Sequence, residues 1–185
     1  TVIAYQEVPI AADIQRQVRT LNRTTSIDIV SELDVVLAEL FAAAICDLLD
    51  SSGINAEDIV AIGSHGQTIL HLPEDTHPRT LQIGDANIIA NLTGICTVGD
   101  FRRMDIAAGG QGAPLAPGFH QWYFGSDDSK RIILNIGGMA NLTVLYTNEI
   151  TGFDSGPGNA LLDDWIRQHK GLEFDRDGQW AASGK

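Results

Sequence analysis

Asp105 is the residue of this chain best placed to act as a general base. It lies six residues before the run Gln111-Gly112-Ala113-Pro114, where we predict that a strand gives way to a glycine-rich turn. Glycine lets the backbone approach a small polar substrate, and a carboxylate there can take a proton from water or a hydroxyl. Residues 98–117 mix acids, bases, glycines and prolines, which predicts an active-site loop and no packed element. The alternative is that Asp105 caps a helix or pairs with Arg102 or Arg103.

One arginine of this stretch is expected to bind an anionic part of a substrate. A guanidinium matches the geometry of a phosphate or carboxylate, and either Arg102 or Arg103 could fill this role while the other remains a surface charge. We assign the role to Arg103. Gln111, within the glycine turn, is assigned as a further substrate-binding residue.

A second polar turn, Ser64-His65-Gly66-Gln67, follows the β-branched run Ile59–Gly63, which predicts a buried strand. Ser64 and His65 are adjacent and point to opposite sides of an extended chain, so they do not form a nucleophile–base pair. We predict that His65 and Gln67 hydrogen-bond a polar substrate. A buried structural role for both side chains is the alternative.

Two glycine-rich turns later in the chain predict a nucleotide site. The segment Asn135–Asn141 reads as a hairpin whose glycines permit positive φ and whose consecutive amides can wrap phosphate oxygens. Asp154–Asn159 leads into a helix whose N-terminal amides can face an anion, while Asp154 holds a hydrated divalent cation. An ordinary hairpin and an ordinary helix entry are the alternatives. The assigned nucleotide-binding residues are Asn135, Gly137, Gly138, Asn141, Asp154, Gly156, Gly158 and Asn159.

Composition narrows the classes of partner. The chain has 185 residues, 44% of them hydrophobic, and a net charge of -12, which repels nucleic acid and anionic membranes. Its most apolar run, residues 37–49, is too short to span a bilayer, and no signal peptide opens the chain. Cys46 and Cys96 have no neighbours at metal-ligand spacing and are predicted to be buried thiols, which favours a cytoplasmic protein.

Hydrophobic periodicity predicts the elements that must position these residues. Helices are expected at 10–21, 28–49 (stopped by Ser51-Ser52-Gly53), 85–92, 115–124 and 160–169. Strands are expected at 59–63, 79–83, 95–98, 131–136, 141–146 and 150–153. The polar linker 125–130 has turn chemistry, and we place a domain boundary there.

Four motifs in order identify a family resemblance. They are Ser64-His65-Gly66-Gln67-Thr68, Asp100-Phe101-Arg102-Arg103 through Gly109-Gly110-Gln111-Gly112-Ala113-Pro114-Leu115, Asn135–Asn141 and Phe153–Asn159. Together they resemble the anhydro-N-acetylmuramic acid kinase family. The resemblance implies an α/β, actin-like (ribonuclease H-like) ATPase fold with ATP and Mg²⁺ bound between two lobes. Residues 1–125 would then form most of the first, sugar-binding lobe, and residues 130–185 would start the second, nucleotide-binding lobe.

The resemblance also implies an activity. Such an ATP-dependent sugar kinase cleaves the 1,6-anhydro bond of the muramic sugar with water and phosphorylates O6, giving N-acetylmuramic acid 6-phosphate in bacterial peptidoglycan recycling. By position, Asp105 resembles the base that activates the water. The metal ligands are not identified by these motifs, and a homodimer is left open.

One family motif has no counterpart in this sequence. The first phosphate loop, of the type Gly-Thr-Ser-x-Asp-Gly, is absent. We therefore expect an internal fragment, incomplete at both ends, that turns over ATP poorly by itself. The alternatives are an actin-fold kinase for another sugar or a small acid, and a non-catalytic lobe that binds sugar or nucleotide.

Overall fold

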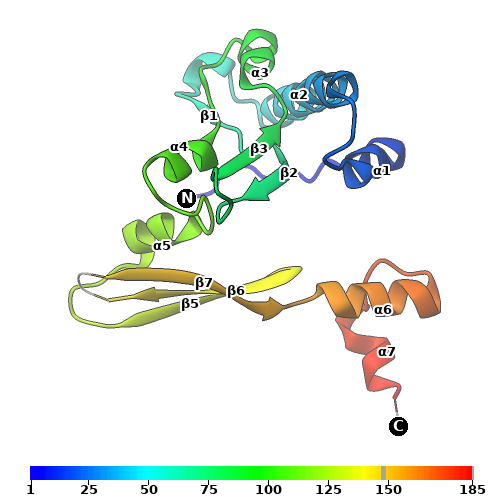
Figure 1. Cartoon of the computed structure of the whole chain (residues 1–185), viewed down its shortest axis with the longest axis vertical. Helices are drawn as coiled ribbons and strands as arrows, with labels where there is room; N and C mark the ends of the chain where they lie inside the picture. Colours follow the sequence, from blue (N-terminus) through cyan, green and yellow to red (C-terminus); the bar gives the residue numbers. More distant parts are fainter. Residues whose placement is uncertain (147–148, 185) are drawn as a thin grey trace. The chain divides into compact units, whose positions relative to one another are not determined.

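The computed structural model describes residues 1–146 and 149–184 and divides the chain into two compact units, Thr1–Gly112 and Ala113–Lys185. Each unit combines helices with small sheets, so the chain is of the mixed α/β class (Figure 1). Helix α5 (Ala116–Phe124) groups with the second unit. The predicted boundary lies just after this helix, at 125–130.

The first unit is built around the long helix α2 (Ile27–Ser52). Ser26 caps its first turn by accepting a hydrogen bond from the Asp28 amide, and Gly53 ends it in the left-handed conformation. The predicted stop at Ser51-Ser52-Gly53 is confirmed. Leu33 and Leu37 of this helix are buried with Ile83, and partly buried side chains of α1 pack against them. The other helices of this unit are α1 (Ala12–Thr20), η1 (Ala56–Asp58), α3 (Ala86–Thr93) and α4 (Phe101–Ala107).

Two small sheets complete the first unit. β1 (Ile62–Gly63) pairs in parallel with β4 (Thr97–Val98), and β2 (Gln67–Leu72) pairs in antiparallel fashion with β3 (Arg79–Ile83). The strand predicted at 59–63 is therefore wrong over its first three residues, and Val60 is 94% exposed. β2 is absent from the predicted strands because polar residues interrupt its apolar pattern. Its strand conformation depends on the pairing with β3, which the local sequence does not show.

The predicted active-site loop at 98–117 contains a helix. Residues 101–107 include neither glycine nor proline, so α4 forms there, and the glycines begin only at 109. Asp105 consequently lies near the end of a helix and not at the end of a strand. The helix follows Asp100, which has a positive φ of 61°.

The second unit is an antiparallel sheet with a helix on one face. Its strands β5 (Arg131–Ile136), β6 (Met139–Leu145) and β7 (Ile150–Pro157) lie in that order, and α6 (Ala160–Lys170) follows. α5 contacts β6 and β7, and His120 of α5 is hydrogen-bonded to the buried Thr143 hydroxyl at 2.8 Å. η2 (Arg176–Gly178) and α7 (Gln179–Ala182) end the described chain.

Two predictions about this unit need correction. The strand predicted to end at Phe153 continues to Pro157, so the first four residues of the expected turn at 154–159 are extended chain. Gly137 and Gly138 form the predicted hairpin, but neither has a positive φ.

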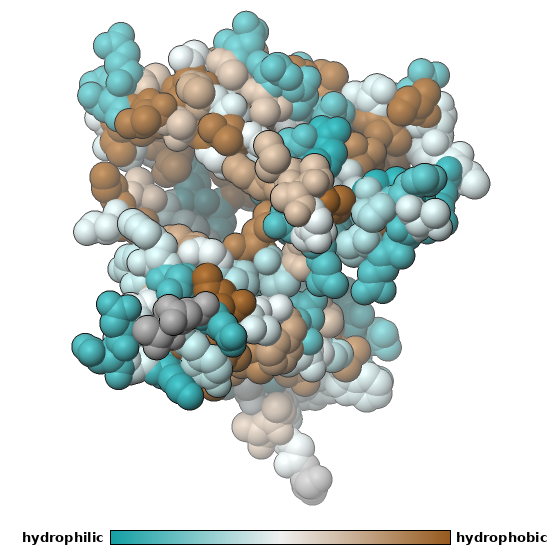
Figure 2. Space-filling model, turned by 60° about the vertical axis from the view of Figure 1, so that its left-hand side comes forward, coloured by the Kyte–Doolittle hydropathy of each residue, from teal (hydrophilic) through white to brown (hydrophobic). Residues whose placement is uncertain are grey.

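Many apolar side chains remain at the surface. Ile132, Leu134 and Ile136 of β5 are 65%, 54% and 60% exposed, and Figure 2 shows apolar residues in brown interspersed with hydrophilic ones in teal. Cys46 and Cys96 are also exposed, so the prediction of buried thiols was wrong. Within residues 1–146 and 149–184, no helix is long and apolar enough to cross a membrane.

Two glycines of the second unit, one inside a helix and one at a helix end, should respond oppositely to substitution by alanine. A Cβ at Gly118, inside α5, would meet nothing within 4 Å, whereas Gly171 caps α6 with a φ of +67°. We expect Gly118→Ala to raise the free energy of unfolding by about 0.5–1 kcal/mol, since alanine loses less backbone entropy. Gly171→Ala should lower it by about 1 kcal/mol because alanine is strained in that conformation. Chemical denaturation measures both, and shifts of the same sign would contradict this reading.

Candidate functional site

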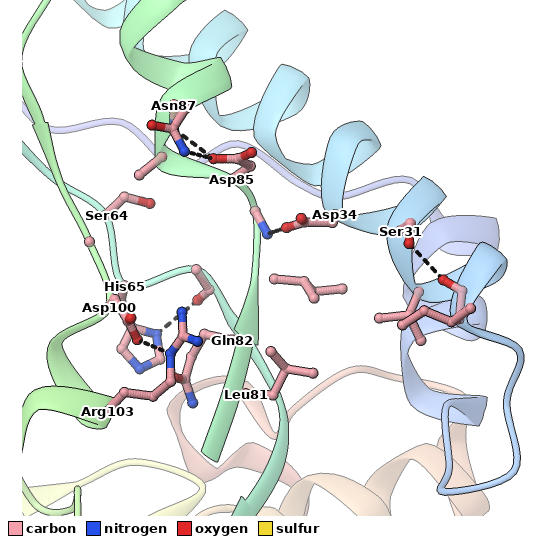
Figure 3. Close-up of a pocket in the computed structure, with 17 residues that line it drawn as sticks. Ser31, Asp34, Ser64, His65, Leu81, Gln82, Asp85, Asn87, Asp100 and Arg103 are labelled. Carbon is pink, nitrogen blue, oxygen red and sulfur yellow. Dashed lines mark hydrogen bonds and ion pairs between the residues drawn. The ribbon is translucent and has the colours of Figure 1, made fainter. Parts of the chain in front are cut away.

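A cavity of about 520 Å³ in the first unit gathers polar side chains from five parts of the chain (Figure 3). They are Ser31 and Asp34 of α2, Ser64 and His65 after β1, Gln82 of β3, Asp85 and Asn87 at the start of α3, and Asp100 and Arg103 at the start of α4. The structure thus brings together two of the predicted substrate residues, His65 and Arg103. Gln67 lies on β2 and lines a different cavity, and Gln111 is exposed outside this pocket.

Arg103 gives the pocket its positive charge. It is the one lysine or arginine among the described residues that line this cavity. Its Nε donates to Asp100 Oδ1 at 2.6 Å, and this hydrogen bond raises the pKa of Arg103, which stays a cation. Both side chains are about half exposed, so the pair itself adds little stability. The terminal guanidinium nitrogens remain available to an anionic ligand.

The opposite wall supplies acceptors. Asp34 Oδ1 accepts the Gly84 amide at 2.6 Å, a contact that spans fifty residues of sequence. Gln82 also lines the cavity, and its Oε1 is buried with no donor among the described residues. Neither residue was predicted, because no local motif marks them. Carboxylates and amides beside apolar side chains such as Leu81 suit a ring with hydroxyl groups.

Asp105 does not line this cavity, and it is held by the glycine turn after α4. Its Oδ2 accepts the Gly112 amide at 2.7 Å, and its backbone carbonyl accepts the Gly110 amide at 2.8 Å. A Cβ built on Gly110 would lie 2.6 Å from Asp105 Cγ, so only glycine leaves room for the carboxylate. Within the described parts of the chain no donor reaches Oδ1, and neither Arg102 nor Arg103 pairs with Asp105. The alternatives of a cap and of an arginine partner are therefore not found.

In the second unit, three of the predicted nucleotide residues lie side by side across the sheet. Asn135 pairs in register with Asn141, and Asn141 pairs with Asp154. Directly opposed residues of an antiparallel sheet share a face, so two amides and a carboxylate form one polar row. Asn135 and Asp154 are exposed and open to a ligand.

The two glycine turns of this unit are joined to each other. The Gly158 and Ala160 amides donate to the Gly138 carbonyl at 2.9 and 3.2 Å, and the Asn159 amide donates to the Gly137 carbonyl at 2.7 Å. The N-terminal amides of α6, predicted to face an anion, are therefore partly used by the hairpin. Gly158 is packed so closely that a Cβ would overlap the Gly137 oxygen.

A cation site is not preformed in the residues the structure describes. They contain no group of three histidine, cysteine or acidic side chains that could hold a metal ion. Asp154, exposed beside Asn141, offers a single carboxylate, and Mg²⁺ is commonly bound by one or two carboxylates together with substrate phosphates.

Comparisons with known proteins find similarity to one family, and the match to its model covers the whole chain. The family model for anhydro-N-acetylmuramic acid kinase matches residues 1–185. A protein of that name from Photobacterium profundum is 54% identical over 165 residues, which cover 89% of this chain and 44% of the relative. Those from Vibrio vulnificus and Coxiella burnetii are 47% and 50% identical and cover 99% and 100% of this chain and 50% and 51% of the relatives. The chain therefore spans about half the length of these relatives.

Proposed function

The chain belongs to the anhydro-N-acetylmuramic acid kinase family, and from that premise we propose that it is part of a kinase for 1,6-anhydro-N-acetylmuramic acid. The reaction would consume ATP and water and release N-acetylmuramic acid 6-phosphate, in bacterial cell-wall recycling in the cytoplasm. The match over all 185 residues carries this proposal. An actin-like ATPase fold belongs to the same proposal, with the first unit binding sugar and the second starting the nucleotide lobe.

The sugar would bind in the cavity lined by His65 and Arg103, and its C1 end would extend out of this cavity to the glycine turn that holds Asp105. Its hydroxyls would meet Asp34, and its lactyl carboxylate would meet the terminal nitrogens of Arg103. Because the chain carries a net charge of -12, an anionic substrate needs such a local cation. Gln67 and Gln111 remain proposed substrate residues without a place in this cavity.

Asp105 would act as the general base. Its carboxylate takes a proton from water as the water oxygen attacks C1 of the sugar. The C1–O6 bond breaks, and O6 forms a bond to the γ-phosphorus of ATP as the bond to ADP breaks. Gly110 and Gly112 keep the carboxylate in place, with Oδ2 fixed by the Gly112 amide and Oδ1 left to receive the proton.

The second unit would bind the nucleotide. The row of Asn135, Asn141 and Asp154 and the joined glycine turns support this assignment. Asp154 would hold Mg²⁺, which neutralises phosphate charge during transfer. The backbone around the phosphates would be shaped by the remaining proposed residues, Gly137, Gly138, Gly156, Gly158 and Asn159.

A chimeric protein tests the proposed function. Residues 1–185 would replace the matching segment of the Coxiella burnetii relative, which they cover over 189 aligned residues. With the anhydro-muramic sugar and Mg-ATP, we expect a product heavier by one water and one phosphoryl group in mass spectrometry. A product that gains only a phosphoryl group, or no product from a folded chimera, would refute the function.

Arg103→Met tests which part of the sugar Arg103 contacts. A charge-assisted hydrogen bond contributes roughly 1.5–3 kcal/mol, so calorimetry on this chain should show about 10- to 100-fold weaker binding of the anhydro-muramic sugar. Binding of 1,6-anhydro-N-acetylglucosamine, which lacks the lactyl carboxylate, should not change. Arg79→Met, which removes an exposed arginine paired with Asp75, is the matched control. An equal loss of affinity for both sugars would show that Arg103 does not bind the lactyl carboxylate.

A further inference from the structure

Arg102 links two segments that lie far apart in the sequence. It is half-buried on α4, between the cavity-lining turn after β1 and the glycine turn that holds Asp105. Its Nε donates to His65 Nε2 at 2.7 Å, and its NH1 donates to the Gly112 carbonyl at 2.6 Å. One planar guanidinium thus bridges two acceptors, which a single ammonium group does not reproduce.

The contact with Arg102 determines the hydrogen-bonding form of His65. Arginine keeps its protons, so His65 Nε2 must accept and carries no proton. The remaining ring proton then sits on Nδ1 and donates to the Gly66 carbonyl, 2.8 Å away. These two contacts therefore hold the His65 ring in one tautomer at the edge of the cavity.

The contact with Gly112 reaches the proposed base. The Gly112 amide donates to Asp105 Oδ2, and the Gly112 carbonyl accepts from Arg102. Both backbone polar groups of Gly112 are therefore hydrogen-bonded. Gly112 is buried and has a φ of +71°. A change in Arg102 would release one end of Gly112 and, through it, the amide that holds the carboxylate.

We propose that Arg102 is a positioning residue that fixes His65 in the cavity and Asp105 on the glycine turn in one arrangement. This role rests on the proposed function and extends it, since the guanidinium itself touches neither reacting group. Displacing a catalytic group by about 1 Å can cost roughly 10²-fold in rate, so the role predicts a large effect on turnover.

Two measurements on Arg102→Met and Arg102→Lys test the proposal. In this 185-residue chain, ¹⁵N NMR of the His65 ring should show a fixed Nδ1-protonated form in the unchanged protein and averaging of the two ring nitrogens in Arg102→Met. In the chimera, both variants should lower kcat by about 10- to 100-fold, by more than they raise KM, because lysine cannot span both acceptors.

The outcomes separate this role from the proposed function. A fixed His65 tautomer in Arg102→Met, or normal kcat in Arg102→Lys, would overturn the positioning role. An inactive unchanged chimera would refute the kinase function instead, and the NMR result would still decide whether Arg102 orients His65. Arg79→Met is the control, because Arg79 also donates to a backbone carbonyl, at 2.9 Å, but lies outside the site.

Discussion

Gly110→Ala in the chimera is expected to lower turnover by about 10²-fold or more, the range that a lost general base costs. The added methyl group would overlap the Asp105 carboxylate and force it away from the Gly112 amide. Gly110 has no positive φ, so alanine fits the backbone there. The loss should therefore appear in kcat, with little change in the melting temperature.

Gly118→Ala in the same chimera is the matched control. Its methyl group meets open space, so turnover should be unchanged. Normal turnover of Gly110→Ala would mean that the carboxylate need not sit where the glycine turn holds it. That result would remove the structural basis for Asp105 as base.

Gly158→Ala is expected to separate the two glycine turns of the second unit. A methyl group at 158 would overlap the Gly137 oxygen and displace the three amides that bind the Gly137 and Gly138 carbonyls. At roughly 1 kcal/mol for each hydrogen bond, the free energy of unfolding should fall by about 2–3 kcal/mol. Binding of Mg-ATP by this chain should be lost in calorimetry, because the turns no longer hold their arrangement.

The folding measurement has its own control in Gly138→Ala. A Cβ there would lie 4.0 Å from that of Ala160, an ordinary contact, so stability should change little. If Gly158→Ala unfolds like the unchanged chain and binds Mg-ATP as well, the joined turns have no role in nucleotide binding.

Local signals were sufficient for most helices and for the hairpin. The helix of 26 residues beginning at Ile27 has a regular apolar spacing and a terminal glycine, and the structure confirms both predictions. The strand predicted at 79–83 and the helix predicted at 85–92 are also confirmed. β2 could not be predicted in this way, because it depends on its pairing with β3.

Only part of the candidate site could be predicted from the sequence, because most of its residues carry no motif. His65 and Arg103 meet in one cavity, but Asp34 and Gln82 arrive from a helix and a strand that carry no motif. In the sequence, the flanking glycines and prolines of the stretch around Asp105 favour a loop and obscure the helix-forming residues 101–107. The sequence does not distinguish Arg102 from Arg103, and only the structure shows the two acceptors of Arg102.

Asp105→Asn in the chimera is the most direct test of the central claim, that this carboxylate activates the attacking water. Asparagine keeps the size of the side chain and an acceptor for the Gly112 amide but cannot take the proton. We predict that product formation falls by about 10²- to 10⁴-fold while calorimetry shows unchanged binding of the anhydro sugar. Product formation at the rate of the unchanged chimera would contradict the assignment of Asp105 as the base.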